Sequence, residues 1–213
     1  MRTFPWEGGT VYATDDDPRC VLVYMASAER EDAEALFHAL EGDAPFALAL
    51  YGVEDWNTLS PWAADRFPGG GQATLRRLEA ALAALPEDYA ALPCYIGGYS
   101  LAGLFALWAL HESRRFSGCA AVSGSFWYPG LVDYVRSAPL PPEAKIYLSL
   151  GKKEHKSRNA LMRTVNECLN ALYDHYATRC HCILEWNEGN HFTEPMERMR
   201  KGFAWLFSLT PNS

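Results

Sequence analysis

The sequence predicts an α/β fold in which a mostly parallel sheet carries helices on both faces. Short apolar runs rich in strand-forming residues alternate with longer segments whose apolar residues recur at helical spacing. Strands that alternate with helices imply parallel pairing, because each crossover helix packs on a face of the sheet. The 213 residues are 49% apolar and show no repeat or linker, so we expect one domain over residues 1–213.

Each element follows from its pattern and length. Strands are expected at residues 20–25, 46–51, 94–98, 119–123, 145–150 and 180–186. Helices are expected at residues 30–41, 74–85, 101–111, 131–137, 159–176 and 194–208. Residues 52–71 form a long loop rich in Pro, Gly and Trp, and loops of this length are often functional. Parallel sheets bind ligands at the carboxyl ends of their strands, so chemistry is expected there.

The charge of the chain narrows the choice of partners. A formal net charge of −7 disfavours nucleic acid and anionic membrane surfaces, which leaves a small molecule as the expected partner. No stretch has the apolar length of a membrane-spanning helix. The first residues lack the apolar core of a signal peptide, so we expect a cytoplasmic protein. The oligomeric state stays open.

The six cysteines do not form a metal-binding pattern. Most lie in apolar runs, where a reduced cysteine packs as a small hydrophobic residue, and no CxxC pair occurs. The sequence Cys180-His181-Cys182 lies on a predicted strand, whose alternation places His181 on the face opposite the two thiols. We therefore expect no zinc site at these residues.

A candidate nucleophile lies where a predicted strand runs directly into a predicted helix. The motif is Gly98-x-Ser100-x-Ala102, followed by Gly103. A serine on such a turn exposes its hydroxyl, and its neighbours must be small because strand and helix approach closely. The helix N-terminus stabilises negative charge, and the Leu101 N–H would point at a developing oxyanion. Alanine at position 102 replaces the more usual glycine, and the alternative is a serine that only caps a buried helix.

The candidate base is His191. A serine hydroxyl needs a base, usually a histidine held by a carboxylate, and in this architecture the chain order is Ser, acid, His. His191 lies between the last predicted strand and the last predicted helix, at the sheet edge where Ser100 is also expected. Three other histidines lie on predicted helices, at expected surface or boundary positions, and a fourth lies inside a strand: His38, His111, His175 and His181.

The candidate acid is Glu154, the first carboxylate after the predicted strand at residues 145–150. Gly151 allows a sharp exit from that strand. The run Lys-Lys-Glu-His around Glu154 is also typical of a solvated surface. Asp133 precedes the strand and Glu188 lies close in sequence to the histidine, so both remain candidates. A serine–histidine pair without an acid is a further alternative.

Together these residues resemble the esterase family of α/β-hydrolases that includes the enterochelin (siderophore) esterases and the esterase D-like enzymes. The likeness runs from about residue 21 to residue 206 and rests on GGYSLAG at 97–103, LGKKE at 150–154, GNHF at 189–192, the loop at 55–62 and the tail at 195–206. The resemblance implies an α/β-hydrolase fold with a minimal cap, a triad of Ser100, Glu154 and His191, and ester hydrolysis without cofactor or metal. Members often carry extra strands or a domain at the N-terminus, where this chain is short.

The second oxyanion donor departs from the family pattern. A glycine-containing turn usually follows the early strand, but this chain has Met25-Ala26-Ser27-Ala28. We therefore expect the backbone N–H of Ala26 or Ser27 to act together with that of Leu101.

Aromatic residues fall on loops expected to flank the nucleophile. They are Trp56, Trp62, Phe126, Trp127 and Tyr128. Such residues either line a pocket or pack the loops down, and we expect Trp56 and Trp127 to bind substrate.

The sequence thus predicts a carboxylic-ester hydrolase that works through an acyl-enzyme. The acyl and alcohol groups of its substrate stay unassigned. An acyltransferase on the same scaffold and a non-catalytic binding protein are the alternatives.

Overall fold

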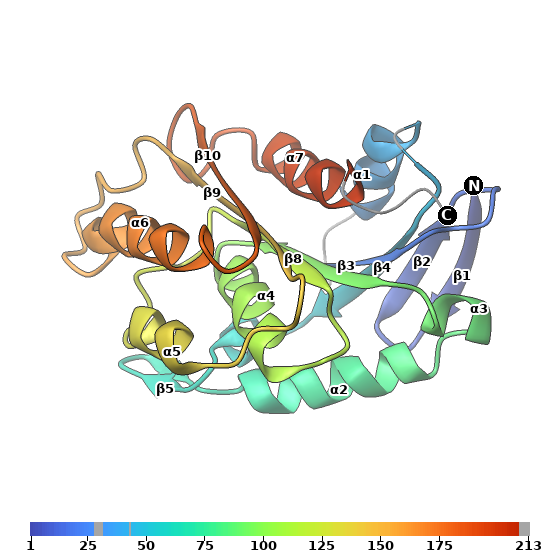
Figure 1. The fold of residues 1–213 in the computed structure, drawn as a ribbon, viewed down its shortest axis with the longest axis horizontal. Coiled ribbons are helices and arrows are strands. Elements are labelled where there is room, and N and C mark those ends of the chain that lie inside the picture. Colours follow the sequence, from blue (N-terminus) through green and yellow to red (C-terminus); the bar gives the residue numbers. More distant parts are fainter. Residues whose placement is uncertain (28–31, 43, 209–213) are drawn as a thin grey trace.

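A computed structural model describes residues 1–27, 32–42 and 44–208 (Figure 1). Its centre is an eight-stranded sheet in the order β1-β2-β4-β3-β7-β8-β9-β10. The strands are β1 Arg2–Trp6, β2 Gly9–Ala13, β3 Val21–Ser27, β4 Ala47–Val53, β7 Cys94–Tyr99, β8 Gly118–Val122, β9 Lys145–Gly151 and β10 His181–Asn187. All neighbours from β4 to β10 pair in parallel, and only the β1–β2 and β2–β4 pairs are antiparallel. The predicted, mostly parallel sheet is confirmed.

Helices cover both faces of this sheet (Figure 1). They are α1 Asp32–Leu40, α2 Gly71–Ala83, α3 Glu87–Ala90, α4 Leu101–Glu112, α5 Leu131–Ser137, α6 Val165–Tyr176 and α7 Pro195–Ser208, with 3-10 turns η1 Trp56–Leu59 and η2 Met162–Thr164. Apolar side chains of α1 and α7 form one core with the sheet, and those of α2, α4, α5 and α6 form the other. The two cores hold the carboxyl ends of the parallel strands in fixed positions.

The central strand β7 and the helix α4 form the most deeply buried part of the fold. Every residue of β7 is buried, and so is every residue of α4 from Leu101 to His111. A helix that is apolar all round lies inside a protein rather than on its surface, as predicted here. The turn between β7 and α4 therefore has a rigid frame on both sides.

The N-terminal hairpin is a feature that the sequence did not predict. β1 and β2 extend the sheet at one edge, with Arg2 opposite Ala13 and Trp6 opposite Gly9. β1 contains Pro5 and is largely exposed. Proline is tolerated on an edge strand because its missing N–H faces solvent. A short, exposed strand with a proline carries little apolar pattern, which explains why it escaped prediction.

The helix expected at residues 159–176 was predicted too long. The α-helix begins only at Val165, after the 3-10 turn η2. The Asn159 side chain accepts hydrogen bonds from the N–H groups of Leu161 and Met162, at 2.9 and 3.3 Å. This local turn competes with helix formation, as asparagine commonly does.

The expected loop at residues 52–71 contains more structure than predicted. It holds η1 and a small hairpin of β5 Ala63–Ala64 and β6 Phe67–Pro68. The side chain of Asp55 caps η1 by accepting from the N–H of Asn57. Residues 30–31 of the first predicted helix lie outside the described residues. The boundaries of the other predicted elements agree within three residues.

The Cys180-His181-Cys182 segment is the start of β10. His181 is exposed, whereas the two cysteines are half-buried. Burial raises the pKa of the Cys180 thiol to about 11, so it is protonated at neutral pH. In residues 1–27, 32–42 and 44–208, no three His, Cys, Asp or Glu side chains group as metal ligands do. Over the same ranges, no helix combines the length and apolarity needed to cross a bilayer.

Candidate active site

Ser100 occupies a strained turn between β7 and α4. Its backbone has φ of 61° and ψ of −119°, a conformation that costs a non-glycine residue about 1–3 kcal/mol. Backbone hydrogen bonds on both sides hold the turn: Ser100 N–H donates to the Val122 carbonyl at 3.1 Å, and Ser125 N–H donates to the Ser100 carbonyl at 3.0 Å. The surrounding sheet thus maintains the conformation that a nucleophilic serine needs.

Small residues around Ser100 are required by close approach. A Cβ atom added to Gly98 would lie 2.5 Å from the Cβ of Ala102, a distance that real contacts do not show. A Cβ added to Gly103 would lie 2.9 Å from the Gly98 carbonyl and 3.1 Å from the backbone of Val122. Alanine fits at position 102 because position 98 is glycine, so the departure from the usual motif leaves the turn intact.

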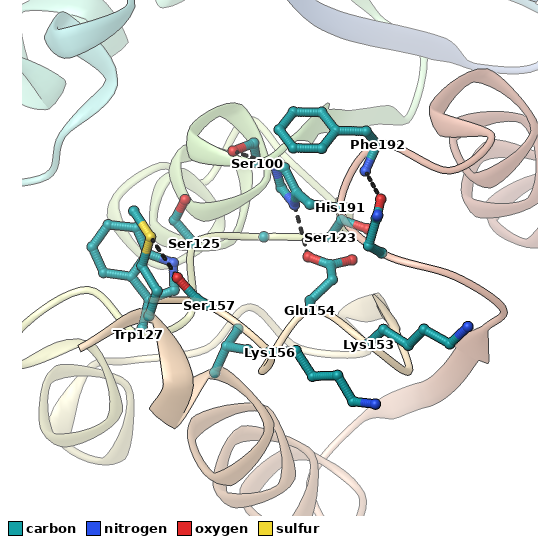
Figure 2. A pocket seen from close by; sticks show the side chains of 14 residues that line it. Ser100, Ser123, Ser125, Trp127, Lys153, Glu154, Lys156, Ser157, His191 and Phe192 are labelled. Atoms are coloured by element: carbon teal, nitrogen blue, oxygen red, sulfur yellow. Dashed lines mark hydrogen bonds and ion pairs between the residues drawn. The ribbon is translucent and has the colours of Figure 1, made fainter. Parts of the chain in front are cut away.

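The imidazole of His191 connects the serine with a carboxylate (Figure 2). His191 Nε2 lies 3.1 Å from Ser100 Oγ, and His191 Nδ1 lies 2.7 Å from Glu154 Oε2. In the neutral ring, Nδ1–H donates to the carboxylate, which leaves Nε2 free to accept the serine proton. The structure therefore brings together the three residues predicted from the sequence, from loops after β7, β9 and β10.

Glu154 is buried and held at both carboxylate oxygens. Its side chain is 6% exposed. Oε1 accepts from the Gly151 N–H at 2.7 Å and from Arg198 Nη1 at 3.0 Å, while Oε2 faces His191. Burial acts to raise the pKa of Glu154, but the hydrogen bond and charge of His191 and the Gly151 N–H outweigh it and lower the pKa below its usual value. The carboxylate is therefore ionised at neutral pH.

The rival acids do not lie in the site. The carboxylate of Asp133 is exposed on α5 and pairs with Arg136 at 3.4 Å. The side chain of Glu188 is exposed and pairs with Lys152. Among the candidates, only Glu154 contacts the histidine within the described residues.

Two hollows meet at Ser100, His191 and Phe192. The larger, of about 370 Å³, extends past Trp127, and the smaller, of about 220 Å³, extends past Trp56. The two tryptophans chosen from the sequence thus line different hollows. The Phe192 ring is 85% exposed and stands beside the histidine in Figure 2. A bound molecule that fills both hollows would pass the serine hydroxyl at its middle.

The remaining aromatic candidates pack the loops instead. Phe126 and Tyr128 are buried in the core. Trp62 packs edge-on against Tyr128, and its Nε1–H donates to the Pro129 carbonyl at 3.0 Å. None of these three residues lines either hollow.

The oxyanion donors are only partly located. Leu101 begins α4, where the first N–H groups of a helix have no intrahelical partner. Ala26 and Ser27 end β3, whose parallel register with β7 pairs Met25 with Gly98. They therefore lie next to the end of β7, and Ala28 lies outside the described residues. The second donor stays a prediction.

One histidine differs from expectation. His111 was predicted at a surface or boundary position, but it is buried at 7% exposure. The end of α4 is covered by α6 and by the segment after α5: His111 Nε2 lies 2.6 Å from the Tyr176 hydroxyl, and Nδ1 lies 2.7 Å from the Pro139 carbonyl. His38 is exposed and His175 is half-buried, as expected, and His181 lies on a strand, as predicted.

Arg198 is a site residue whose role sequence reasoning missed. The sequence places it only in the predicted last helix, yet its guanidinium donates to the carboxylate of Glu154 at 3.0 Å. The one sequence signal of a buried role was that Arg198 lies on the apolar face of the predicted last helix. In the structure its neighbour Met199, on that face, is buried in the core.

Comparisons with known proteins give the fold its class. No family model matches the chain. The uncharacterized protein YbbA of Bacillus subtilis is 28% identical over 171 residues, 71% of this chain and 68% of that protein.

Solved structures match over nearly the whole chain. An IroE-like serine hydrolase from Shewanella oneidensis superposes with a TM-score of 0.74 at 16% identity, over 93% of this chain and 75% of that one. The siderophore hydrolase EstA from Aspergillus nidulans gives 0.71 at 17% identity, over 95% and 90%. The enterobactin esterase FES from Shigella flexneri gives 0.65 at 18%, over 97% and 58%. With the sheet order above, these likenesses show that the chain has the α/β-hydrolase fold.

Proposed function

We propose that the protein is a carboxylic-ester hydrolase with Ser100 as nucleophile, His191 as base and Glu154 as the residue that orients the base. The observation that carries the proposal is the continuous chain from Ser100 Oγ through the imidazole to a buried carboxylate, at 3.1 and 2.7 Å. The strained turn at Ser100 and the hollows beside it supply the other parts that ester hydrolysis needs.

The reaction follows from this geometry. Ser100 Oγ attacks the ester carbonyl carbon while His191 Nε2 takes the hydroxyl proton. The Leu101 N–H and an N–H from Ala26 or Ser27 bind the oxyanion. His191 then donates its proton to the departing alcohol, which leaves an ester of Ser100. Water, deprotonated by the same imidazole, releases the acid and restores the serine.

Glu154 acts through His191 and does not meet the substrate. Its negative charge stabilises the imidazolium that forms in each half of the reaction, and its bond to Nδ1 fixes the tautomer. Because the carboxylate is buried and ionised, its field at the imidazole is screened little by water.

The proposed substrate is a small-molecule ester that extends into both hollows. Two of the three structural neighbours described above bear names that refer to siderophore hydrolysis or to enterobactin. Their identities to this chain are 17 and 18%, so siderophore esters enter the proposal as compounds to test beside simple aryl esters and acetylated sugars.

The test compares wild type with Ser100→Ala on aryl esters of graded acyl length. We expect loss of hydrolysis on the order of 10⁶-fold for this variant. Ser137→Ala, an exposed serine on α5, is the matched control and should keep full activity. Unchanged turnover by Ser100→Ala would refute the proposal. Products transferred to added alcohol or amine acceptors, in preference to hydrolysis, would redirect it to acyl transfer.

A further inference from the structure

The guanidinium of Arg198 contacts both the carboxylate of Glu154 and the segment directly before His191. The residue sits on α7 and is 2% exposed. The two N–H hydrogens of Nη1 are shared among three side-chain oxygens, at 3.2, 3.0 and 3.0 Å: Tyr99 Oη, Ser123 Oγ and Glu154 Oε1. Nη2 donates to two backbone carbonyls, those of Glu188 at 2.7 Å and Asn190 at 3.0 Å. One side chain thus contacts the segments that follow β8, β9 and β10 and the end of β7 itself.

The five oxygen partners of the Arg198 guanidinium are more than an ion pair with Glu154 requires. Burying a guanidinium is costly, and among the residues that the structure describes the carboxylate of Glu154 is its one ion-pair partner. The additional partners are neutral, and two of them are carbonyls of the loop that carries His191. Arginine can serve all of them because its donors point in fixed, divergent directions, which an ammonium group cannot reproduce.

We propose that Arg198 is a positioning residue that sets the geometry between Glu154 and His191; this inference rests on the proposed ester hydrolysis. By occupying Glu154 Oε1 together with the Gly151 N–H, it leaves Oε2 directed at His191 Nδ1. By binding the Asn190 carbonyl, it fixes the residue immediately before the histidine. Arg198 does not contact the serine or the hollows.

Tyr99 gives Arg198 a second connection to the histidine. The Tyr99 hydroxyl accepts from Nη1 and donates to the His191 carbonyl at 2.7 Å. Burial raises the pKa of Tyr99, so the hydroxyl keeps the proton that it donates. The same guanidinium therefore binds the carboxylate of Glu154 directly and the backbone of His191 through Tyr99.

The charge of Arg198 also balances that of Glu154 at the imidazole. Lys153 and Lys156 also line the larger hollow, with their ends directed away from Ser100 in Figure 2. Glu188 and Lys152 pair with each other at the surface. Removing Arg198 would leave the buried carboxylate uncompensated and strengthen its hold on the protonated imidazole.

The test uses Arg198→Met and Arg198→Lys, with Arg200→Met as control. Arg200 lies on the same helix but is paired with Glu197 near the surface. For Arg198→Met we expect kcat to fall about 10²-fold with little change in KM, because the reacting groups lose alignment. The acidic limb of its pH–rate profile, which reports protonation of the base, should move to higher pH. Arg198→Lys keeps the charge, so it should lose rate without moving that limb, and Arg200→Met should change neither.

Tyr99→Phe keeps the test decisive if Arg198→Met does not fold. It removes only the hydroxyl that joins Arg198 to the His191 carbonyl, and we expect about a 10-fold loss in kcat with KM unchanged. An active wild type whose folded Arg198 variants keep wild-type kcat and the same acidic limb would overturn the positioning role. A wild type that neither hydrolyses esters nor reacts with a fluorophosphonate would overturn the proposed function, and the inference with it.

Discussion

The two ends of α4 each hold a histidine with both ring nitrogens occupied. At the N-terminal end, His191 lies between the hydroxyl of Ser100 and the carboxylate of Glu154. At the C-terminal end, His111 lies between the Tyr176 hydroxyl and the Pro139 carbonyl. Both bridge two polar partners, yet only the first is suited to proton transfer.

The difference lies in the partners and not in the amount of space. A hollow of about 530 Å³ adjoins His111, larger than either hollow at Ser100. However, His111 is held by a neutral carbonyl, and its burial lowers its pKa. The charge of the Glu112 carboxylate acts to raise the pKa of His111, but burial outweighs it, and neither hydrogen-bond partner of the ring is a carboxylate. Tyr176 is fully buried, and burial raises the pKa of its hydroxyl. A bridging histidine thus needs a carboxylate on one side and an activated, accessible hydroxyl on the other.

Exchanging each histidine for glutamine gives the largest contrast. His191→Gln should lose ester hydrolysis on the order of 10⁶-fold, because no base remains. Its free energy of unfolding should change little, since the ring lies half-exposed. His111→Gln should keep wild-type kcat and KM but lose about 1–3 kcal/mol of stability, because buried polar groups lose good partners. Aryl ester kinetics and urea unfolding measure the two effects.

This contrast would fail if the losses were exchanged or shared. A His111→Gln protein with normal stability and greatly reduced kcat would indicate that proton transfer occurs at His111, at the C-terminal end of α4, and would contradict the role given to His191. Tyr176→Phe is the companion control, since it removes the other side of the same hydrogen bond and should also act on stability alone.

The acid provides the next largest effect. Glu154→Gln should lower kcat on the order of 10⁴-fold, because the amide cannot stabilise the imidazolium or fix the correct tautomer. Glu188→Gln, the rival whose side chain is exposed and paired with Lys152, should leave kcat within the error of wild type. Equal losses in the two variants, measured with one aryl ester, would reject Glu154 as the orienting residue.

Much of the site was predictable from the sequence because its signals are local. The glycine motif around Ser100 indicates a tight strand-to-helix turn, and the order of strands determines which loops reach the same edge of the sheet. His191 follows from that order, whereas Glu154 was one of three carboxylates that the order left open. The role of Arg198 and the burial of His111 could not be predicted, because both depend on contacts between residues far apart in the sequence. Arg198 and Glu154 are separated by 44 positions, and His111 and Pro139 by 28. The edge strand β1 was missed because it is exposed and contains Pro5.

The two tryptophans offer a smaller, sharper test of the site. Because Trp127 and Trp56 line different hollows, one should affect the acyl side of the ester and the other the alcohol side. We expect Trp127→Ala and Trp56→Ala each to lower kcat/KM about 10-fold for bulky esters, and less for acetyl or methyl esters. Two substrate series, varied on one side of the ester at a time, measure this. If both variants responded to the same series, the two hollows would not receive opposite sides of the ester.

The smallest expected effect is the pH dependence of stability at His111. Its pKa in the folded protein is lowered by burial, against about 6.5 in an unfolded chain. The unfolded chain therefore binds more protons just below that value, so stability falls as the pH drops below about 6.5. Wild type should lose more stability than His111→Gln over this window in urea unfolding. His175, whose pKa is also lowered by burial, is common to both proteins. Equal losses would contradict the assignment.

The central claim is that the Ser100 hydroxyl is activated by His191, and peptide mapping after reaction with a fluorophosphonate tests it most directly. We predict one phosphonyl adduct on the peptide that contains Ser100, absent from Ser100→Ala and formed far more slowly in His191→Gln. Labelling of the His111→Gln protein should match wild type. An adduct on another residue, or equal labelling of Ser100 with and without His191, would contradict the account.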